Sequence, residues 1–185
     1  GHQALIQQTV EWAAQWGTRA VALTFDVHPR EILQATGSLR YLTPLPQKVP
    51  LLRAFGVHEV VVLPFTLDFA ALTGEEFARQ LLWEQLAARH VVVGPDFAFG
   101  RKRGWNTADL RELGTQYGFT VEVVEEVVSQ GQPIRSTSIR QLLEEEGSPG
   151  IERGGARVRR VGGQDARLHL EGARLAGESL HLVSV

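Results

Sequence analysis

The sequence has no cysteine at any of its 185 positions. This absence excludes a disulfide scaffold, a thiolate zinc site and a cysteine nucleophile. It also agrees with the reducing conditions of a cytoplasm. No apolar run approaches the roughly 20 residues that a membrane-spanning helix needs, and nothing at the start of the sequence has the pattern of a signal peptide. We therefore expect a cytoplasmic protein with no membrane partner.

Methionine is absent as well, and lysine occurs only at Lys48 and Lys102. No methionine opens the sequence, and a helical pattern already begins at His2. We therefore expect the natural protein to begin earlier, with a strand and a loop ahead of Gly1. Arginine supplies most of the positive charge.

Neither sign of charge is in large excess, because 19 Lys and Arg residues face 21 Asp and Glu residues, for a net charge of -2. This balance gives no support to nonspecific binding of nucleic acid or of a membrane surface. An anionic small substrate would need a local group of cations instead. The hydrophobic content of 43% is ordinary for a globular protein. The sequence makes no prediction about the oligomeric state.

Helical patterns alternate with short apolar runs through the first 147 residues. Apolar runs predict strands at 20–25, 60–63, 91–93 and 121–124. Helical spacing and cap signals predict helices at 4–16, from about 47 to 55, and at 73–86, 107–117 and 137–145. This alternation is typical of an α/β protein with a parallel sheet covered on both faces. Ligands of such sheets bind beyond the carboxyl ends of the strands.

The character of the sequence changes after Gly-Ser-Pro-Gly at 147–150. Beyond it, the alternating segments 168–170 and 180–183 predict a hairpin joined through 172–177. We expect one domain over 1–147 and a short β-rich segment over 151–185. About 35 residues of this kind bury too little to be stable alone, so the segment should pack on the main domain or belong to a second one.

Two predicted helix starts carry groups that bind anions. Gly1 and His2 open the first helix, and Ser136 and Thr137 open the last, with Arg140 one turn further on. Free N–H groups and the positive end of the helix dipole favour phosphate at such places. Taken singly, each has an ordinary alternative, namely a surface histidine and a serine helix cap.

The loop at 94–104, Gly-Pro-Asp-Phe-Ala-Phe-Gly-Arg-Lys-Arg-Gly, combines three kinds of group. Gly94 and Gly100 would let the backbone approach a ligand. Phe97 and Phe99 are suited to hold a flat ring, and the basic run that starts at Arg101 to attract phosphate. The alternative is a solvated basic turn whose phenylalanines belong to the core.

Five segments, in order, together resemble one family. They are Gly-His at 1–2, Leu-Thr-Phe-Asp-Val-His-Pro-Arg-Glu at 23–31, Val-Val-Leu-Pro-Phe at 61–65, the loop at 94–104, and Ile-Arg-Ser-Thr-Ser-Ile-Arg at 134–140. This pattern resembles the N-terminal FMN adenylyltransferase module of bacterial bifunctional riboflavin kinase/FAD synthetases. The resemblance covers about residues 1–147 and implies a Rossmann-like sheet of the type found in nucleotidylyltransferases with a His-x-Gly-His motif.

The sequence departs from that family's pattern in three places. Only the Gly-His half of the His-x-Gly-His motif is present, as Gly1 and His2. Arg135 stands where the Ser-Ser-Thr-x-x-Arg motif has its first serine. Residues 167–185 resemble a hairpin of the family's riboflavin kinase domain, but the kinase signature Pro-Thr-Ala-Asn does not occur. Either the kinase domain is degenerate or shortened, or the chain is part of a bifunctional enzyme whose kinase domain lies mostly outside this sequence. Kinase activity has no support in the sequence itself.

The resemblance implies transfer of AMP from ATP to FMN, giving FAD and pyrophosphate, with Mg²⁺ bound to the phosphates. FMN and ATP are then the expected partners, and nucleic acid is not. The site residues that it implies are His2, Ser136, Thr137 and Arg140 for catalysis, Gly1, Gly94, Gly100 and Arg101 for the nucleotide, Asp26, His28, Pro29, Phe97 and Phe99 for the flavin, and Asp96 for the metal.

Two other functions fit the same residues. The chain could be an adenylyl- or cytidylyltransferase of the same superfamily that acts on a nicotinamide, pantetheine or glycerol phosphate. It could also be a relative that binds flavin or nucleotide without catalysis. Asp26 and His28 also have a purely structural alternative, in which they cap the strand end and satisfy one another.

Overall fold

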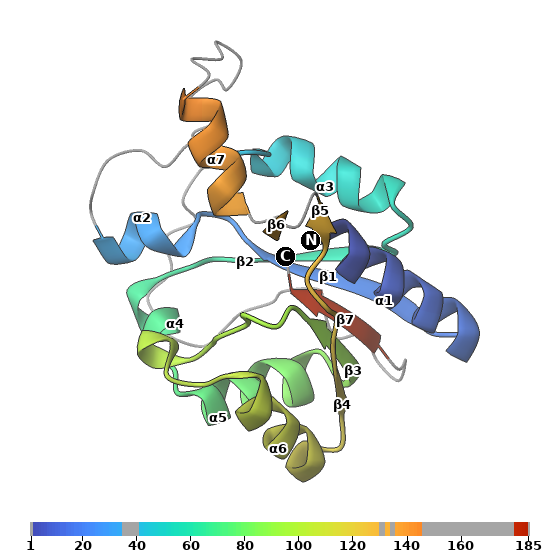
Figure 1. Ribbon diagram of the computed structural model, residues 1–185. Coiled ribbons are helices and arrows are strands. Elements are labelled where there is room, and N and C mark those ends of the chain that lie inside the picture. Colours follow the sequence, from blue (N-terminus) through green and yellow to red (C-terminus); the bar gives the residue numbers. More distant parts are fainter. Residues whose placement is uncertain (1, 35–40, 130–131, 134–135, 146–179, 185) are drawn as a thin grey trace.

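A five-stranded sheet forms the centre of the molecule (Figure 1). The computed structural model describes residues 2–34, 41–129, 132–133, 136–145 and 180–184. The strands are β1 (Arg19–Phe25), β2 (Glu59–Leu63), β3 (Ala88–Val93), β4 (Thr120–Val123) and β7 (Leu180–Ser184). Their order is β2-β1-β7-β3-β4, and every neighbouring pair is parallel. The predicted parallel α/β fold is confirmed.

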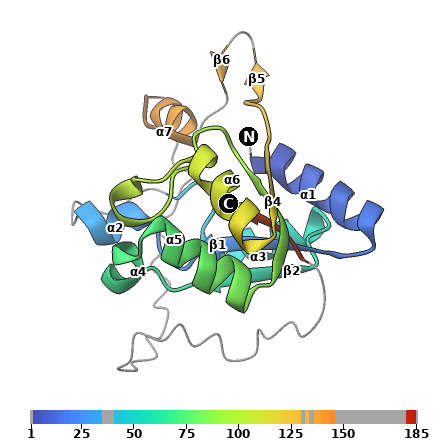
Figure 2. The same ribbon diagram turned by 90° about the horizontal axis from the view of Figure 1, so that it is seen from below.

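Helices cover both faces of this sheet (Figures 1 and 2). One face, called the upper face here, packs against α1 (His2–Trp16) and α3 (Leu45–Ala54). The other, called the lower face, carries α4 (Leu67–Ala71), α5 (Gly74–Glu76), the π-helix η1 (Phe77–Gln85) and α6 (Thr107–Tyr117). The remaining elements are α2 (Pro29–Gln34), the 3₁₀ turn η2 (Arg101–Arg103), the two-stranded ladder β5 (Val128–Ser129) and β6 (Gln132–Pro133), and α7 (Ser136–Glu145).

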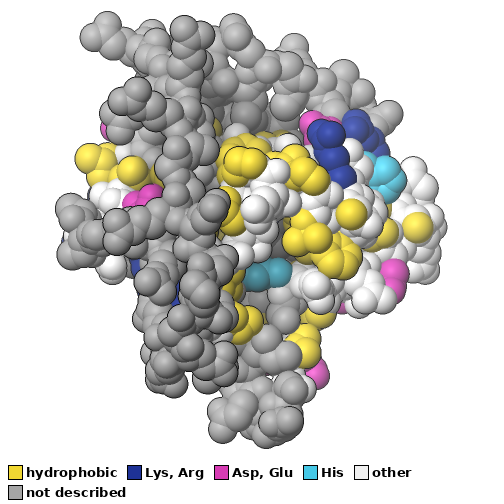
Figure 3. All heavy atoms as spheres, turned by 90° about the horizontal axis from the view of Figure 1, so that it is seen from above, with side chains coloured by type: hydrophobic (Ala, Val, Ile, Leu, Met, Phe, Trp, Pro, Cys, Tyr) yellow, Lys and Arg dark blue, Asp and Glu magenta, His cyan; other side chains and the backbone are white. Residues whose placement is uncertain are grey.

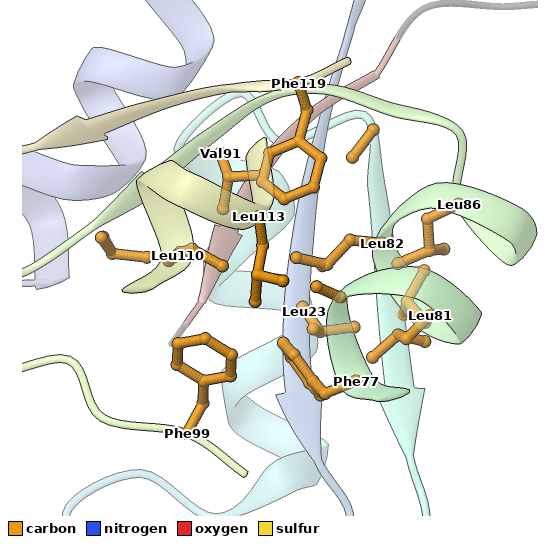
Figure 4. Close-up of a cluster of buried hydrophobic side chains, with 14 of the residues drawn as sticks. Leu23, Phe77, Leu81, Leu82, Leu86, Val91, Phe99, Leu110, Leu113 and Phe119 are labelled. Carbon is orange, nitrogen blue, oxygen red and sulfur yellow. The ribbon is translucent and has the colours of Figure 1, made fainter. Parts of the chain in front are cut away.

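The core divides according to the two-residue period of the strands. Ala22 and Val92 point to the upper face and join Leu5, Ile6 and Leu52 of α1 and α3. The larger cluster lies on the lower face, where strand residues meet η1 and α6 (Figure 4). It includes Val21, Leu23, Leu63, Leu81, Leu82, Leu86, Val91, Val93, Leu110, Leu113 and Phe119. The continuous apolar runs of the sequence are thus explained by burial on both faces.

Strand β7 lies in the middle of the sheet, paired with β1 on one side and β3 on the other. The predicted hairpin of 168–170 with 180–183 is therefore wrong for the second segment, because both edges of β7 are occupied by parallel partners. Residues 168–170 lie outside the described residues. The alternating pattern of 180–183 identified a strand, but pairing partners are set by the sheet as a whole.

The predicted helices appear within one or two residues of their expected bounds, with one change of type. Thr73 and Glu76 form the predicted capping box, with Glu76 N donating to Thr73 Oγ1 at 3.1 Å and Thr73 N to Glu76 Oε2 at 2.8 Å. After this first turn the helix continues as the π-helix η1. The short helices α2 and α4 were not predicted, because five or six residues are too few to show a helical period.

Tryptophan packing fixes the position of α1. Trp12 Nε1 donates to Glu122 Oε2 at 2.6 Å, and the same oxygen lies 3.1 Å from His90 Nε2. The rings of Trp12 and Trp16 meet the His90 ring edge-on. This partly buried network ties the C-terminal half of α1 to β3 and β4.

Candidate active site

The carboxyl ends of the strands collect the residues to which the sequence pointed. Helix α1 leads into β1, so it runs antiparallel to the strands and its first residue, His2, lies at their carboxyl edge. Asp26, His28 and Pro29 directly follow β1. Arg140 lies in α7, and its charge helps to lower the pKa values of His2 and His28. Segments far apart in the sequence therefore meet at one edge of the sheet.

Asp26 joins the ends of β1 and β2. Its Oδ1 accepts hydrogen bonds from Val27 N at 2.8 Å and from Phe65 N at 2.9 Å, and its own N–H donates to the Leu63 carbonyl at 3.0 Å. The carboxylate thus caps backbone groups that the sheet leaves unpaired. It holds the two strand ends in register beneath the site.

His28 is fixed by its own loop. Its Nδ1 accepts from Arg30 N at 3.2 Å, and its backbone N–H donates to Tyr41 Oη at 2.9 Å. Burial, followed by the charges of Arg140, Arg30 and Lys48, lowers the pKa of His28 to about 4. The ring is therefore neutral at pH 7, and because Nδ1 accepts, Nε2 carries the proton and is a donor.

We use the name basic cluster for four side chains at this edge, namely His2, His28, Lys48 and Arg140. Desolvation of part of the ring, then the charges of Lys48 and Arg140, lowers the pKa of His2, although its side chain stays exposed on one side. The pKa of Lys48 is lowered by burial and by Arg140, and that of Arg140 by burial and by Arg30. The charged neighbours named here are all positive, so the cluster favours an anion.

Helix α7 begins at Ser136, so Ser136 and Thr137 occupy its first turn and Arg140 lies one turn on. Thr137 is exposed, while Ser136 and Arg140 are half-buried. The predicted start of this helix is confirmed to within one residue. Gly1 and Arg135 lie outside the described residues.

Phe97 and Phe99 stack on one another, with ring centroids 5.4 Å apart and planes 22° apart. Phe99 is buried in the lower core, 6% exposed, whereas Phe97 is only partly buried. Further rings, in edge-on or tilted contact, extend this pair into an aromatic row, with centroid separations of 5.0–6.2 Å along Phe25, Phe65, Phe69, Phe77, Phe99 and Phe97. Phe99 therefore supports Phe97 from the core side.

The glycines of the 94–104 loop differ in what surrounds them. Gly100 has φ +69°, and a Cβ there would lie 2.6 Å from Gly74 N. A Cβ on Gly94 would meet nothing within 4 Å. Arg101 is exposed, and its N–H donates to the Leu72 carbonyl. Gly100 thus allows close packing of the loop on α5, while Gly94 borders open space.

Asp96 is exposed in the turn after β3, where Arg103 donates to its carbonyl at 3.4 Å. Among the described residues, no group of three or more His, Asp or Glu side chains is arranged to hold a metal ion. A hard cation that takes most of its oxygen ligands from phosphates and water needs only one or two carboxylates. Asp96 offers one.

Several residues of this edge escaped the sequence analysis. Lys48 lies in the first turns of a helix without any motif, and Tyr41 in a loop that shows no period. Phe25 and Phe69 belong to no motif, because the aromatic row forms only when β1, β2 and α4 are brought together. On the described part of the face seen from above, apolar side chains lie beside a recessed histidine (Figure 3).

This arrangement identifies the class of fold to which the chain belongs. A doubly covered parallel sheet with a basic cluster and an aromatic row at its carboxyl edge is a Rossmann-like fold of the nucleotidyltransferase type. A comparison with family models matches residues 1–138 to the family described as FAD synthetase. The chain belongs to this family.

Curated relatives carry consistent names. The chain is 39% identical over 145 residues to a putative bifunctional riboflavin kinase/FMN adenylyltransferase of Geobacillus thermodenitrificans, covering 78% of this chain and 75% of that one. It is 34% identical to the bifunctional riboflavin kinase/FMN adenylyltransferase of Listeria monocytogenes and 32% to that of Escherichia coli K12, covering 78% and 77% of this chain. It spans only 46% of the length of each of these two relatives.

A solved structure shares the fold. The Streptococcus pneumoniae protein titled a macrolide-efflux protein superposes with a TM-score of 0.68 at 27% identity, covering 77% of this chain and 47% of that one. In the part of this chain that the structure describes, no helix is both long and apolar enough to cross a bilayer.

Proposed function

We propose that this chain transfers AMP from ATP to FMN, giving FAD and pyrophosphate. Membership of the FAD synthetase family supports the reaction. The observation that carries the proposal is the meeting of the basic cluster and the aromatic row at one edge of the sheet. Phe25 and His28 flank Asp26, so an anion site and an apolar platform adjoin within a few residues. FMN and ATP together present a flat ring system and four phosphates.

In this mechanism an oxygen of the FMN phosphate attacks the α-phosphorus of ATP. The bond from that phosphorus to the oxygen of the β-phosphate breaks, and pyrophosphate leaves with the electron pair. No protein nucleophile is needed, so the chain contributes positioning and charge stabilisation. His2 and Arg140 would contact the triphosphate, and Ser136 and Thr137 would bind it at the start of α7.

The flavin ring would lie against the accessible face of Phe97, which Phe99 holds from below. His28, neutral and with its proton on Nε2, would donate a hydrogen bond to the flavin or its phosphate. Asp26 would act indirectly, because its carboxylate is engaged by backbone N–H groups. Pro29 starts α2 and fixes the chain direction after His28.

Gly94 borders open space after β3 and would let the nucleotide approach the backbone, with Arg101 on the same loop to attract phosphate. Gly100 would serve the site by shaping that loop, and Gly1 would offer its backbone to phosphate. Mg²⁺, when bound, would neutralise phosphate charge, and Asp96 is the side chain that would contact it.

The test is to supply the complete polypeptide with ATP, Mg²⁺ and either FMN, riboflavin, nicotinamide mononucleotide, phosphopantetheine or glycerol phosphate. We expect a dinucleotide product from FMN alone. A product from nicotinamide mononucleotide, phosphopantetheine or glycerol phosphate would replace this proposal with the corresponding transferase. Binding of FMN and ATP without any product would favour a binding protein, and FAD from riboflavin would show that the polypeptide also contains a working kinase.

A further inference from the structure

One of the two lysines of the chain, Lys48, reaches into the proposed site from a helix to which the sequence assigned no role. It lies in α3, four residues after Pro44, the residue that caps the start of that helix. Its Nζ donates a hydrogen bond to Thr24 Oγ1 at 3.3 Å. Thr24 is 2% exposed and precedes the last residue of β1. The half-buried lysine is thus anchored at the carboxyl edge of the sheet. Its partner Thr24 stands shortly before Asp26 and His28 in the sequence.

The surroundings of Lys48 are positive. The Lys48 charge helps to lower the pKa of His2 and the pKa of His28. The Arg140 charge in turn helps to lower the pKa of Lys48. Among the described residues, the hydrogen-bond partner of Nζ is a neutral hydroxyl, and no carboxylate lies within 4.0 Å of it in an ion pair. A cation that is partly desolvated beside other cations costs free energy unless an anion compensates it.

We propose that Lys48 binds the polyphosphate of ATP, at the group that His2 also contacts, and stabilises the negative charge that pyrophosphate carries as it leaves. This inference rests on the proposed function. The ammonium group neutralises charge on the phosphate oxygens and transfers no proton. Thr24 is a positioning residue, because its hydroxyl holds Nζ at the edge of the sheet.

The principal test compares Lys48→Met, which keeps an apolar stem and removes the charge, with Lys48→Arg, which keeps the charge. Arg53→Ala is the matched control, because Arg53 is an exposed cation in the last turn of the same helix. We expect Lys48→Met to weaken pyrophosphate binding in calorimetry and to raise the KM for ATP, each about tenfold or more. FMN binding and the melting temperature should change little, Lys48→Arg should recover part of the loss, and Arg53→Ala should behave as wild type.

A second measurement does not depend on the folding of a variant. The wild-type chain has only Lys48 and Lys102 as lysines, so acylation of each by an amine reagent is easily followed by mass spectrometry. Pyrophosphate should protect Lys48 severalfold, and a small amine added to the same tube reports the activity of the reagent. Equal labelling with and without pyrophosphate, or unchanged pyrophosphate affinity in folded Lys48→Met, would overturn the inference.

The outcomes separate this inference from the proposed function. If the wild type makes FAD and Lys48→Met makes it with the same KM and kcat, only the role of Lys48 falls. If the wild type makes no FAD but binds pyrophosphate in a Lys48-dependent way, the phosphate site stands and the proposed reaction falls.

Discussion

At the scale of single residues, His28 shows how the fold changes the chemistry of a side chain. A histidine in an unfolded chain titrates near pH 6.5, whereas His28 lies among Arg140, Arg30 and Lys48 and is partly desolvated. Its neutral form accepts from Arg30 N at Nδ1 and carries its proton on Nε2, which can donate. The environment therefore supplies a neutral donor beside the proposed phosphate site.

This environment predicts an NMR titration of His28 with a midpoint of about 4, assigned by the loss of its signal in His28→Gln. The sign of the effect on stability follows. Between pH 6.5 and 4 the unfolded chain binds this proton and the folded chain does not, so His28 favours the fold above pH 6.5 and its contribution falls as the pH is lowered toward 4. Pyrophosphate should raise the midpoint, because an anion favours the charged ring. A midpoint near 6.5 that pyrophosphate does not move would contradict the basic cluster.

Arg140 gives a second residue-scale prediction. Arg140→Ala should lower kcat/KM for ATP by about 10²- to 10³-fold, since an oriented cation at the reacting phosphates is lost. Arg140→Lys should recover only part of this, because a lysine cannot bind phosphate oxygens through two parallel N–H groups. Circular dichroism should be unchanged in both variants. Wild-type turnover by folded Arg140→Ala would remove this residue from the phosphate site.

At the scale of elements, the 94–104 loop is shaped by its contact with α5. A Cβ on Gly100 would lie 2.6 Å from Gly74 N, and a Cβ on Gly74 would collide with the Trp105 ring. The positive φ of Gly100 adds to this requirement. In the proposed function, the loop would present Phe97 to the flavin only while this packing is intact.

Gly100→Ala should accordingly destabilise the protein by about 1–3 kcal/mol, through both the backbone strain and the steric contact. Gly94→Ala in the same loop is the matched control, and its stability should stay within about 0.5 kcal/mol of wild type. Urea unfolding followed by tryptophan fluorescence measures both. Equal stability of the two variants would show that the loop does not need its close contact with Gly74.

The elements were largely predictable, because their signals are local. The apolar runs of β1, β2 and β3 and the capping box at Thr73 each lie within a few residues of sequence. The assignment of β7 to a hairpin failed because its partners, β1 and β3, are more than 80 residues away. Lys48 was missed for the same reason, since Thr24 and His2 come to it only through the fold. His2, His28 and Arg140 were proposed as site residues through motif resemblance.

At the scale of the whole molecule, β7, α1 and β1 form a βαβ unit in space, although β7 comes last in the sequence and is not joined directly to α1. β7 and β1 are parallel neighbours, and α1, which packs on both, leads into β1. The carboxyl end of β7 and the start of α1 consequently lie at the same edge of the sheet (Figure 1). A strand feeding directly into α1 at this position is the arrangement expected of such a sheet.

Removal of residues 180–185 should therefore abolish cooperative unfolding, because β1 and β3 lose their shared partner and a domain is stable by only about 5–15 kcal/mol. The same segment, joined ahead of Gly1 through a short glycine linker, should restore a cooperative transition in calorimetry. Wild-type melting of the truncated chain would show that β7 is dispensable for the sheet.

The reaction itself is tested most directly by following the phosphorus atoms. The complete polypeptide would be given FMN, Mg²⁺ and ATP labelled at either the α- or the γ-phosphorus. The account predicts α-label in FAD, γ-label in pyrophosphate, and equal amounts of the two products. Label from the γ-position in a flavin product, or α-label that stays in ADP, would contradict adenylyl transfer to FMN.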